Sequence, residues 1–547
     1  MDKERLPGKR RGGKEKSMSK LGVMLDCSRD GVYTVEALKK YIEILAKMGY
    51  NSLQLYTEEV YEIPEEPYFG YLRGRYTEKE LHELDAFAAE HGVELVPCIQ
   101  TLAHLSGLTR WPEYAPCTDT GDILLAGCER TYELIDHMFA AIARCFTSRR
   151  VNIGMDEAHS IGLGKYLDEH GYSNRFDILK EHLARVGKIA EKYGFRPMMW
   201  SDMFFRLANH GKYDYRGAEF PPELTALVPE NIDLVYWDYY AGEKEFYDGM
   251  LKAHKEFGRH IVFAGGAWSW VGFAPLNGLS LHNSKCAMQA CIENGIDDIF
   301  ITSWKDDGSE SSLFCNLPSL FAAAEYSKGN FDDDAIAEKF GQLFGISFEE
   351  FMALDLPNTC LKGDGGVVNP CKYMLYSDPF FGFLDCTVAE GGGKKFAKVA
   401  KTLEKSERNE QFGYVFRALA DLCRALKCKY DLGVRTREAY AEGREAVAKL
   451  LPDYKKTIKR VEKFYESFRA QWDLECKENG FEHHDIRLGG LVRRLEHCRK
   501  MLADYADGRR DRIPSLEEKI LSFPLADSPK GLSTCYNGWN SNALIHF

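Results

Sequence analysis

The residues best suited to chemistry are two adjacent acids, Asp156 and Glu157, which follow the short apolar run 151–154. A carboxylic acid can protonate a departing oxygen, and a second group can stabilise the positive charge that develops at the reacting carbon. Neighbours on a regular strand point to opposite faces, so both acids reach one pocket only if the strand bends or ends between them. They are therefore poorly placed as an opposed nucleophile and acid. They suit a site in which one acid donates the proton and the other holds the substrate.

Two other interpretations of the acid pair stay open. Either one acid is catalytic and its neighbour is merely solvated, or Asp156, Glu157 and His159 bind a metal ion. Hydrolysis does not require a metal, and no second cluster with metal-ligand spacing appears in the sequence. We therefore expect no metal and no other cofactor.

The tryptophans gather where the acids are. Five of the eight fall at the ends of four candidate strands: Trp200, Trp237, Trp268, Trp270 and Trp304. A single tryptophan at such a place is more often part of a core, but five at equivalent places are harder to explain in that way. The other strand-end candidates are Arg29, His104, Asp202, Tyr239 and Asp306. Flat aromatic faces pack on the C–H surfaces of a sugar while acids and arginine bind its hydroxyls, so the pattern predicts a sugar pocket.

The elements that must position these residues alternate between short apolar runs and helical patterns. The candidate strands are 21–26, 52–56, 93–99, 151–154, 196–200, 232–236, 260–264 and 298–302. Continuous apolar runs are typical of parallel strands buried on both faces. Length, count and alternation predict an α/β fold, a (β/α)8 or TIM barrel, with its site at the C-terminal ends of the strands. A doubly wound open sheet is the alternative, but residues 27–31 are not the glycine-rich phosphate turn that it would need.

The chain divides into three predicted parts. We expect a disordered basic leader over 1–19, the catalytic barrel over 20–330 and a mainly α-helical domain over 331–547. The helical domain supports the barrel or forms a homodimer interface. Within it, the Glu-His-His-Asp stretch 482–485 predicts a polar turn between helices. Three basic side chains there are interpreted as solvated charges: Lys429, Arg437 and Arg493.

Composition narrows the class of protein. The net charge of −12 argues against nucleic-acid binding, which relies on phosphate contacts. No run of about 18 apolar residues occurs, which predicts that the chain does not span or bind a membrane. The 16 cysteines are scattered without a CxxC pair, as is typical of reduced, buried thiols in a cytoplasmic protein.

The strand-end residues resemble glycoside hydrolase family 20, the β-N-acetylhexosaminidases. The matching stretches are 25–29 (Leu-Asp-Cys-Ser-Arg), His104, 154–157 (Gly-Met-Asp-Glu), 200–202 (Trp-Ser-Asp), Trp237 and 303–304 (Ser-Trp). The resemblance covers roughly residues 21–326. It implies an exo-acting enzyme that releases terminal β-linked GlcNAc or GalNAc from a glycan, which is the expected partner.

The resemblance also implies a retaining, substrate-assisted mechanism. The acetamido oxygen of the substrate attacks the anomeric carbon and forms an oxazolinium, so the protein supplies no nucleophile. Asp156 would orient the acetamido nitrogen, and Glu157 would act first as acid and then as base. Tyr239, or alternatively Tyr240, would hydrogen-bond the oxazoline. Arg29 would bind the 3- and 4-hydroxyls, and the pocket walls would be Trp200, Trp237 and Trp304.

The sequence departs from the family pattern in three ways. The usual α/β domain ahead of the barrel is missing, the His104 segment reads Ala-His-Leu instead of Pro-Gly-His, and the oxazoline tyrosine has two candidates. The last two leave the choice between GlcNAc and GalNAc open. The chain resembles the short bacterial members that have two domains. Alternative functions are an endo-acting or disaccharide-releasing enzyme, a non-catalytic sugar-binding barrel, and a metal-dependent barrel isomerase or aldolase.

Overall fold

The computed structural model describes residues 19–217, 220, 222–306, 308–361, 369–382 and 384–520. Apart from Ser19, the predicted leader lies outside the described residues, as does the end of the predicted helical domain, residues 521–547. No helix in the described ranges combines the length and the apolar character needed to cross a lipid bilayer.

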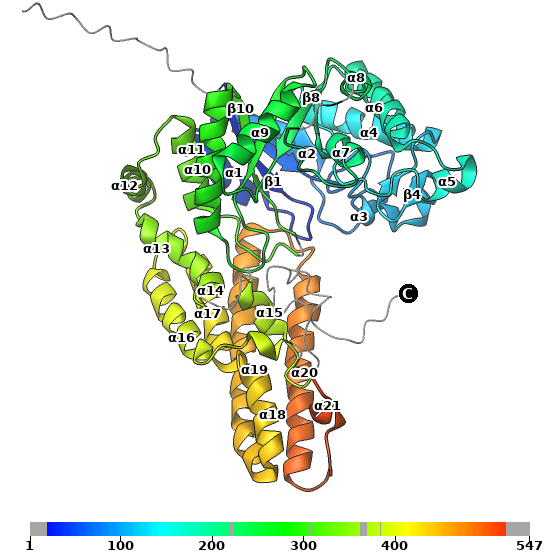
Figure 1. Cartoon of the computed structure of the whole chain (residues 1–547). Helices are drawn as coiled ribbons and strands as arrows, with labels where there is room; N and C mark the ends of the chain where they lie inside the picture. Colours follow the sequence, from blue (N-terminus) through cyan, green and yellow to red (C-terminus); the bar gives the residue numbers. More distant parts are fainter. Residues whose placement is uncertain are drawn as a thin grey trace, which may run out of the picture.

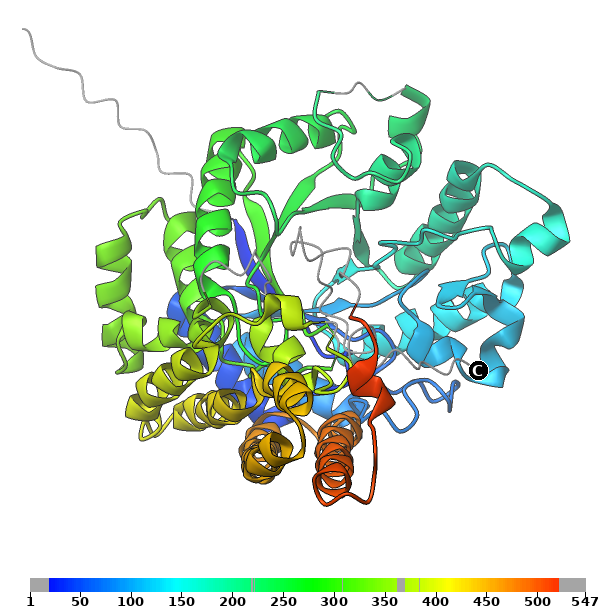
Figure 2. The same ribbon diagram turned by 60° about the horizontal axis from the view of Figure 1, so that its bottom comes forward.

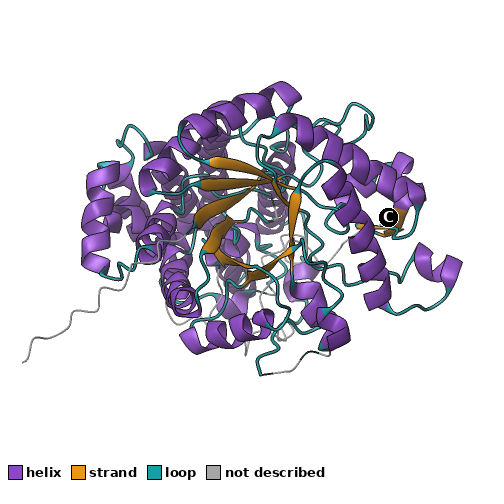
Figure 3. Cartoon of the chain, turned by 90° about the horizontal axis from the view of Figure 1, so that it is seen from above, coloured by secondary structure: helices purple, strands orange, loops and turns teal. Residues whose placement is uncertain are grey.

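The predicted barrel is confirmed. Eight parallel strands close in the order β1-β10-β9-β8-β7-β6-β3-β2, and helices surround them (Figure 3). The strands are β1 (Lys20–Asp26), β2 (Ser52–Tyr56), β3 (Glu94–Cys98), β6 (Arg150–Asn152), β7 (Arg196–Trp200), β8 (Asp233–Trp237), β9 (Ile261–Gly266) and β10 (Asp298–Ser303). Their interior is filled by Met24, Tyr56, Cys98, Met198, Trp200, Val235, Val262, Ala264 and Phe300. Both faces of the strands are covered, which explains the continuous apolar runs in the sequence.

The outer layer follows the predicted helical patterns. Its longer helices are α1 (Val35–Met48), α2 (Glu78–Glu90), α4 (Glu129–Cys145), α6 (Arg175–Lys192), α9 (Lys244–Lys255), α10 (Asn277–Asn294) and α11 (Leu317–Ser327). Helix α2 begins at a capping box, in which Thr77 and Glu80 each hydrogen-bond the backbone N–H of the other. A small antiparallel pair, β4 (Thr118–Thr120) and β5 (Ile123–Leu124), interrupts the third strand-to-helix connection.

The C-terminal part is helical and extends away from the barrel (Figure 1). Its helices are α12 (Asp333–Phe344), α13 (Phe348–Met352), α14 (Leu356–Thr359), α15 (Pro370–Tyr376), α16 (Gly392–Leu403), α17 (Gly413–Lys429), α18 (Leu432–Glu442), α19 (Arg444–Glu475), α20 (Glu482–Ala506) and α21 (Pro514–Glu517). Figure 2 shows the yellow-to-red helices of this set, from α16 onward, in front of the barrel. The residue after α19, Cys476, bridges to Tyr33 in the loop after β1. The helices therefore abut the barrel at the end where its strands finish.

Three predictions about the helical part are wrong: the polar turn at 482–485 and the solvated charges of Lys429 and Arg437. Residues Glu482–Asp485 do not form a turn, because α20 begins at Glu482, and His484 is fully buried with Nε2 2.7 Å from the carbonyl oxygen of Gly308. Burial lowers the pKa of His484 to about 3, so this histidine is neutral. Lys429 is buried as well, and its ammonium donates to the carbonyl of Ser377.

Arg437 also differs from its interpretation as a solvated charge. Its guanidinium pairs with Asp385 and donates to the carbonyl oxygens of Pro379 and Phe380. Arg493, by contrast, is 83% exposed and pairs only at the surface with Glu496. Sequence alone could not separate these cases, because all of these charges stand at plausible surface positions of helical patterns.

Candidate active site

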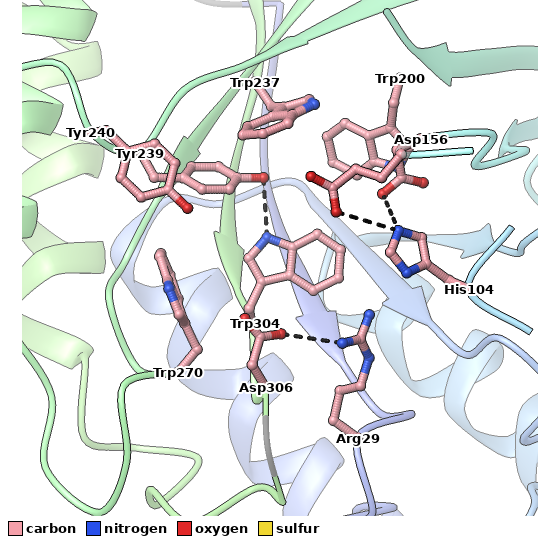
Figure 4. A pocket seen from close by; sticks show the side chains of 11 residues that line it. Arg29, His104, Asp156, Trp200, Trp237, Tyr239, Tyr240, Trp270, Trp304 and Asp306 are labelled. Atoms are coloured by element: carbon pink, nitrogen blue, oxygen red, sulfur yellow. Dashed lines mark hydrogen bonds and ion pairs between the residues drawn. The ribbon is translucent and has the colours of Figure 1, made fainter. Parts of the chain in front are cut away.

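A pocket opens at the C-terminal ends of the barrel strands (Figure 4). It is lined by Arg29, His104, Asp156, Glu157, Trp200, Trp237, Tyr239, Tyr240, Trp270, Trp304 and Asp306. Every predicted site residue except Asp202 and Trp268 is in this set. Trp268 stands one layer behind, stacked on Trp270 with ring centroids 4.7 Å apart, and Asp202 is buried beneath the acid pair.

The chain leaves strand geometry before it reaches the acids. Strand β6 ends at Asn152, and Gly154, Met155 and Glu157 then take positive φ angles of 72°, 70° and 50°. This backbone is strained for residues other than glycine, and such strain is concentrated at functional sites. The turn removes the alternation of a strand, so Asp156 and Glu157 face the same pocket.

His104 lies between the two acids. Its Nε2 is 3.2 Å from an oxygen of Asp156 and 3.8 Å from an oxygen of Glu157. The other Asp156 oxygen accepts a hydrogen bond of 2.8 Å from the amide of Gln100. Burial opposes charge on both partners, but their attraction outweighs it: the pKa of His104 rises to about 9 and that of Asp156 falls below its usual value. Asp156 is thus held as a carboxylate beside an imidazolium.

Aromatic side chains form the walls of the pocket. The Trp304 ring N–H donates to the Tyr239 hydroxyl at 3.0 Å, and Tyr239 stacks on Trp237 with centroids 5.3 Å apart. Trp200 forms the floor, almost completely buried against Trp304. Tyr240, in contrast, is 64% exposed at the rim. Of the two candidate tyrosines, Tyr239 is the one whose hydroxyl is fixed among the walls.

Arg29 is held at another side of the pocket. Its Nε is 3.2 Å from a carboxylate oxygen of Glu58, and its Nη1 is 3.4 Å from Asp306. Its guanidinium carbon lies 6.0 Å from the centre of the Trp304 ring. Tyr56 donates to the same Glu58 oxygen at 3.0 Å. Arg29 therefore presents fixed donors next to an aromatic face, an arrangement suited to sugar hydroxyls.

Two family models match the chain. Residues 21–245 match the catalytic domain of glycosyl hydrolase family 20, and residues 349–534 match the glycoside hydrolase 20C C-terminal domain. The chain belongs to glycoside hydrolase family 20.

Curated relatives of this family 20 chain are distant. It is 26% identical over 233 residues to the beta-hexosaminidase of Vibrio furnissii, covering 35% of this chain and 37% of that protein. It is 24% identical over 348 residues to human hexosaminidase D, covering 57% of this chain and 66% of that protein. The match thus spans between about a third and two thirds of the length of these relatives.

Solved structures are similar over part of the chain. The β-N-acetylhexosaminidase of Bacteroides fragilis has 20% sequence identity and a TM-score of 0.46, covering 61% of this chain and 71% of that chain. The exo β-N-acetylglucosaminidase of Vibrio harveyi, a family 20 enzyme, has 16% identity and a TM-score of 0.47, covering 62% and 59%.

Arg206 of this family 20 chain also lies next to the acid pair, although the strand-end pattern of the sequence did not predict it. Helix α7 (Asp202–Ala208) places it one turn after Asp202, whose carboxylate accepts from Arg206 Nε at 3.0 Å and from the Glu157 backbone N–H at 3.2 Å. Nη2 of Arg206 is 3.4 Å from a Glu157 oxygen. Burial and then the nearby Asp156 raise the pKa of Asp202 to about 7. The i, i+4 spacing of Asp202 and Arg206 was the signal that could have drawn attention to this cation.

The metal interpretation of the acids is not supported by the geometry. His159 is exposed and does not line the pocket. Within the described ranges, no three or more His, Cys, Asp or Glu side chains are arranged to hold a metal ion.

Glu58, which orients Arg29, is a second site residue that the sequence did not predict. Its role depends on the approach of the loops after β1 and β2.

Proposed function

We propose that the protein is an exo-acting β-N-acetylhexosaminidase that releases terminal β-linked GlcNAc or GalNAc by a retaining, substrate-assisted mechanism. The observation that carries this proposal is the turn at residues 154–157, which aims both Asp156 and Glu157 into one aromatic pocket from the same side. A retaining enzyme with its own nucleophile places that carboxylate across the sugar from the acid, about 5–5.5 Å away. Two acids on one turn serve instead a substrate that attacks its own anomeric carbon.

Each acid has the surroundings that its role needs. Asp156 is buried, and His104 keeps it charged, so it can accept a hydrogen bond from the acetamido N–H and polarise that group for attack. The side chain of Glu157 is 40% exposed at the pocket rim, where the leaving group departs, and it donates a proton to the leaving oxygen. In the second step the resulting carboxylate takes a proton from the attacking water.

The remaining pocket residues bind the sugar. Arg29, oriented by Glu58 and Asp306, donates to ring hydroxyls. The Tyr239 hydroxyl hydrogen-bonds the acetamido oxygen as the oxazolinium forms. The ring and the acetamido methyl pack on the aromatic walls, namely Trp200, Trp237, Trp270 and Trp304. Trp268 backs Trp270, and Asp202 fixes the backbone of Glu157.

A panel of aryl β-glycosides with and without the acetamido group tests this function. Because the acetamido oxygen is the nucleophile, GlcNAc and GalNAc glycosides should be hydrolysed, whereas the glucoside and galactoside should be nearly inert. Hydrolysis of the plain glucoside as fast as the acetamido sugar would refute substrate assistance. A thiazoline that mimics the oxazolinium should inhibit competitively. If the protein does not bind this thiazoline, substrate assistance is refuted as well.

A further inference from the structure

A third carboxyl group lies beneath the acid pair. Asp202 is the first residue of α7, and its side chain is fully buried. One of its oxygens accepts two hydrogen bonds, from Arg206 Nε at 3.0 Å and from the Glu157 backbone N–H at 3.2 Å. A carboxylate in such a place is costly unless a cation compensates its charge. Arg206 is the cation that does so.

Arg206 connects this buried acid to the proton donor. Its Nε binds Asp202, and its Nη2 lies 3.4 Å from a Glu157 oxygen. Nη1 donates to the carbonyl oxygen of Gly211 at 3.3 Å, and the guanidinium carbon lies 5.8 Å from the centre of the Trp237 ring. Only 17% of the side chain is exposed. The guanidinium is therefore held next to Glu157 by contacts on several sides.

Arg206 and Asp202 act on Glu157 in opposite directions. A cation next to a carboxyl group favours its ionised form, and an anion nearby favours its protonated form. Glu157 needs both forms, since it donates a proton in the first step and accepts one in the second. Burial and then the nearby Asp156 raise the pKa of Asp202 to about 7. At higher pH Asp202 is ionised and offsets the charge of Arg206.

The other charged or titratable groups near Glu157 line the sugar pocket. His104 Nε2 is 3.8 Å from the second Glu157 oxygen, and Asp156 and Asp306 line the same pocket. Burial raises the pKa of Tyr240 to about 12, so its hydroxyl stays neutral. Neither Arg206 nor Asp202 lines this pocket. These two residues therefore reach Glu157 from α7, without a place at the sugar.

The acids on the outer side of Arg206 have partners of their own. Asp214 binds the guanidinium of Arg216 through both carboxylate oxygens, each at 2.8 Å. Asp238 accepts from two backbone N–H groups in the loop after β8. In the described part of the chain, the ion pairs of Arg206 are thus the two that it forms at the acid pair.

We propose that Arg206 and Asp202 are positioning residues that set the balance between the acid and base forms of Glu157. Arg206 favours the carboxylate, and Asp202 limits this effect while it fixes the backbone of the turn. The inference rests on the proposed hexosaminidase activity. Because both residues act through Glu157, removing either one should shift the pH dependence of the reaction, and the two shifts should have opposite signs.

The test follows kcat/KM against pH for the methyl β-glycoside of GlcNAc, whose leaving group must be protonated. Activity on this substrate falls at high pH as the acid loses its proton. Asp202→Asn leaves the charge of Arg206 uncompensated, so this alkaline limb should move to lower pH by about 0.5–1 unit. Arg206→Gln removes the cation and should move the limb upward by a similar amount. The double variant should lie near the wild type.

Arg206→Lys separates charge from geometry. Lysine keeps the positive charge but lacks the planar fork, so kcat should fall while the alkaline limb stays in place. The dinitrophenyl glycoside of GlcNAc leaves without protonation, so its limb should not move in any variant. Arg216→Gln is the matched control, because it removes an exposed cation that is bound to Asp214 and does not line the pocket.

The outcomes separate the two proposals. Alkaline limbs that stay in place in Asp202→Asn and Arg206→Gln, or that move in the same direction, would overturn this inference alone, provided that the methyl glycoside is still cleaved. If Asp202→Asn does not fold, an upward shift in Arg206→Gln that Arg206→Lys does not share supports the inference, and equal limbs in these two variants overturn it. No hydrolysis of either glycoside by the wild type would overturn the hexosaminidase proposal and this inference with it.

Discussion

At the scale of single residues, Glu157 is distinguished by what touches its two oxygens. One lies near His104 and the other near Arg206, so the carboxyl group is held in place while 40% of its side chain stays exposed. Glu157→Gln keeps the size and removes the proton. We expect kcat to fall about 10²–10⁴-fold on alkyl glycosides and much less on dinitrophenyl glycosides, which leave without protonation. Steady-state kinetics on both classes measures the difference.

The control for this variant is Glu169→Gln, a change at an exposed glutamate of α5 (Lys165–His170) outside the pocket. An equal loss on alkyl and dinitrophenyl glycosides in Glu157→Gln would remove the general-acid role from this residue.

The pair of His104 and Asp156 makes stability depend on pH. The pKa of His104 rises from its usual 6.5 to about 9 on folding, so its contribution is complete below about pH 6.5 and is lost as the pH rises through about 9. The free energy of unfolding of the wild type should exceed that of His104→Gln most near pH 6, and this advantage should shrink by about 1–3 kcal/mol by pH 9.5. Urea unfolding at several pH values measures it. If the difference in free energy of unfolding between the wild type and His104→Gln stayed constant from about pH 6 to about pH 9.5, Asp156 would not be stabilising a protonated His104.

Some of the site residues can be predicted from the sequence pattern and others cannot. Asp156, Glu157 and the strand-end tryptophans stand directly after apolar runs, so the barrel pattern alone brings them to one rim. Arg206 and Glu58 act through loops whose approach no pattern encodes. The choice of Tyr239 over Tyr240 depended on the path of the chain after β8, where Asp238 accepts from the backbone N–H groups of Tyr240 and Ala241.

At the scale of elements, α19 (Arg444–Glu475) contains a proline, Pro452, within its length. A proline inside a helix favours a break, because it lacks a backbone donor and clashes with the preceding turn. The structure has one helix across it. Val447, Leu450, Tyr454 and Ile458 are buried at helical spacing on both sides of the proline, so packing of this continuous face offsets its cost. That unbroken apolar stripe was visible in the sequence.

Glu475, at the end of α19, stabilises the loop after β10 of the barrel through hydrogen bonds. Glu475 is buried and accepts hydrogen bonds from the backbone N–H of Leu313 and the hydroxyl of Tyr414, each at 2.7 Å, and from Ser312. Glu475→Gln introduces an amide N–H where donors already point, so we expect the free energy of unfolding to fall by about 1–3 kcal/mol. Chemical denaturation measures the change. Glu462→Gln, an exposed position on the same helix, is the control. A loss as small as that of the control would show that the carboxylate does not hold the loop.

At the scale of the molecule, the barrel and the helical part share one apolar core. Phe273, in the loop after β9, packs on Phe464 and Phe468 of α19 at 5.1 and 5.4 Å between centroids. The ion pair of Lys372 and Glu310, 2.7 Å long and buried, joins α15 to the loop after β10. Removing the helices would expose this surface and leave a buried charge without its partner.

We therefore expect the two parts to unfold together. Of the tryptophans in the described ranges, all but Trp472 belong to the barrel, so tryptophan fluorescence follows mainly the barrel while far-UV circular dichroism follows both parts. The two probes should give one urea midpoint. Phe464→Ala should lower it for both by the same amount, corresponding to about 3–5 kcal/mol, because the cavity lies between the parts. Tyr172→Ala, at an exposed site, should leave both midpoints in place. Two separate midpoints, or a shift of the circular dichroism transition alone, would show that the barrel is stable without the helices.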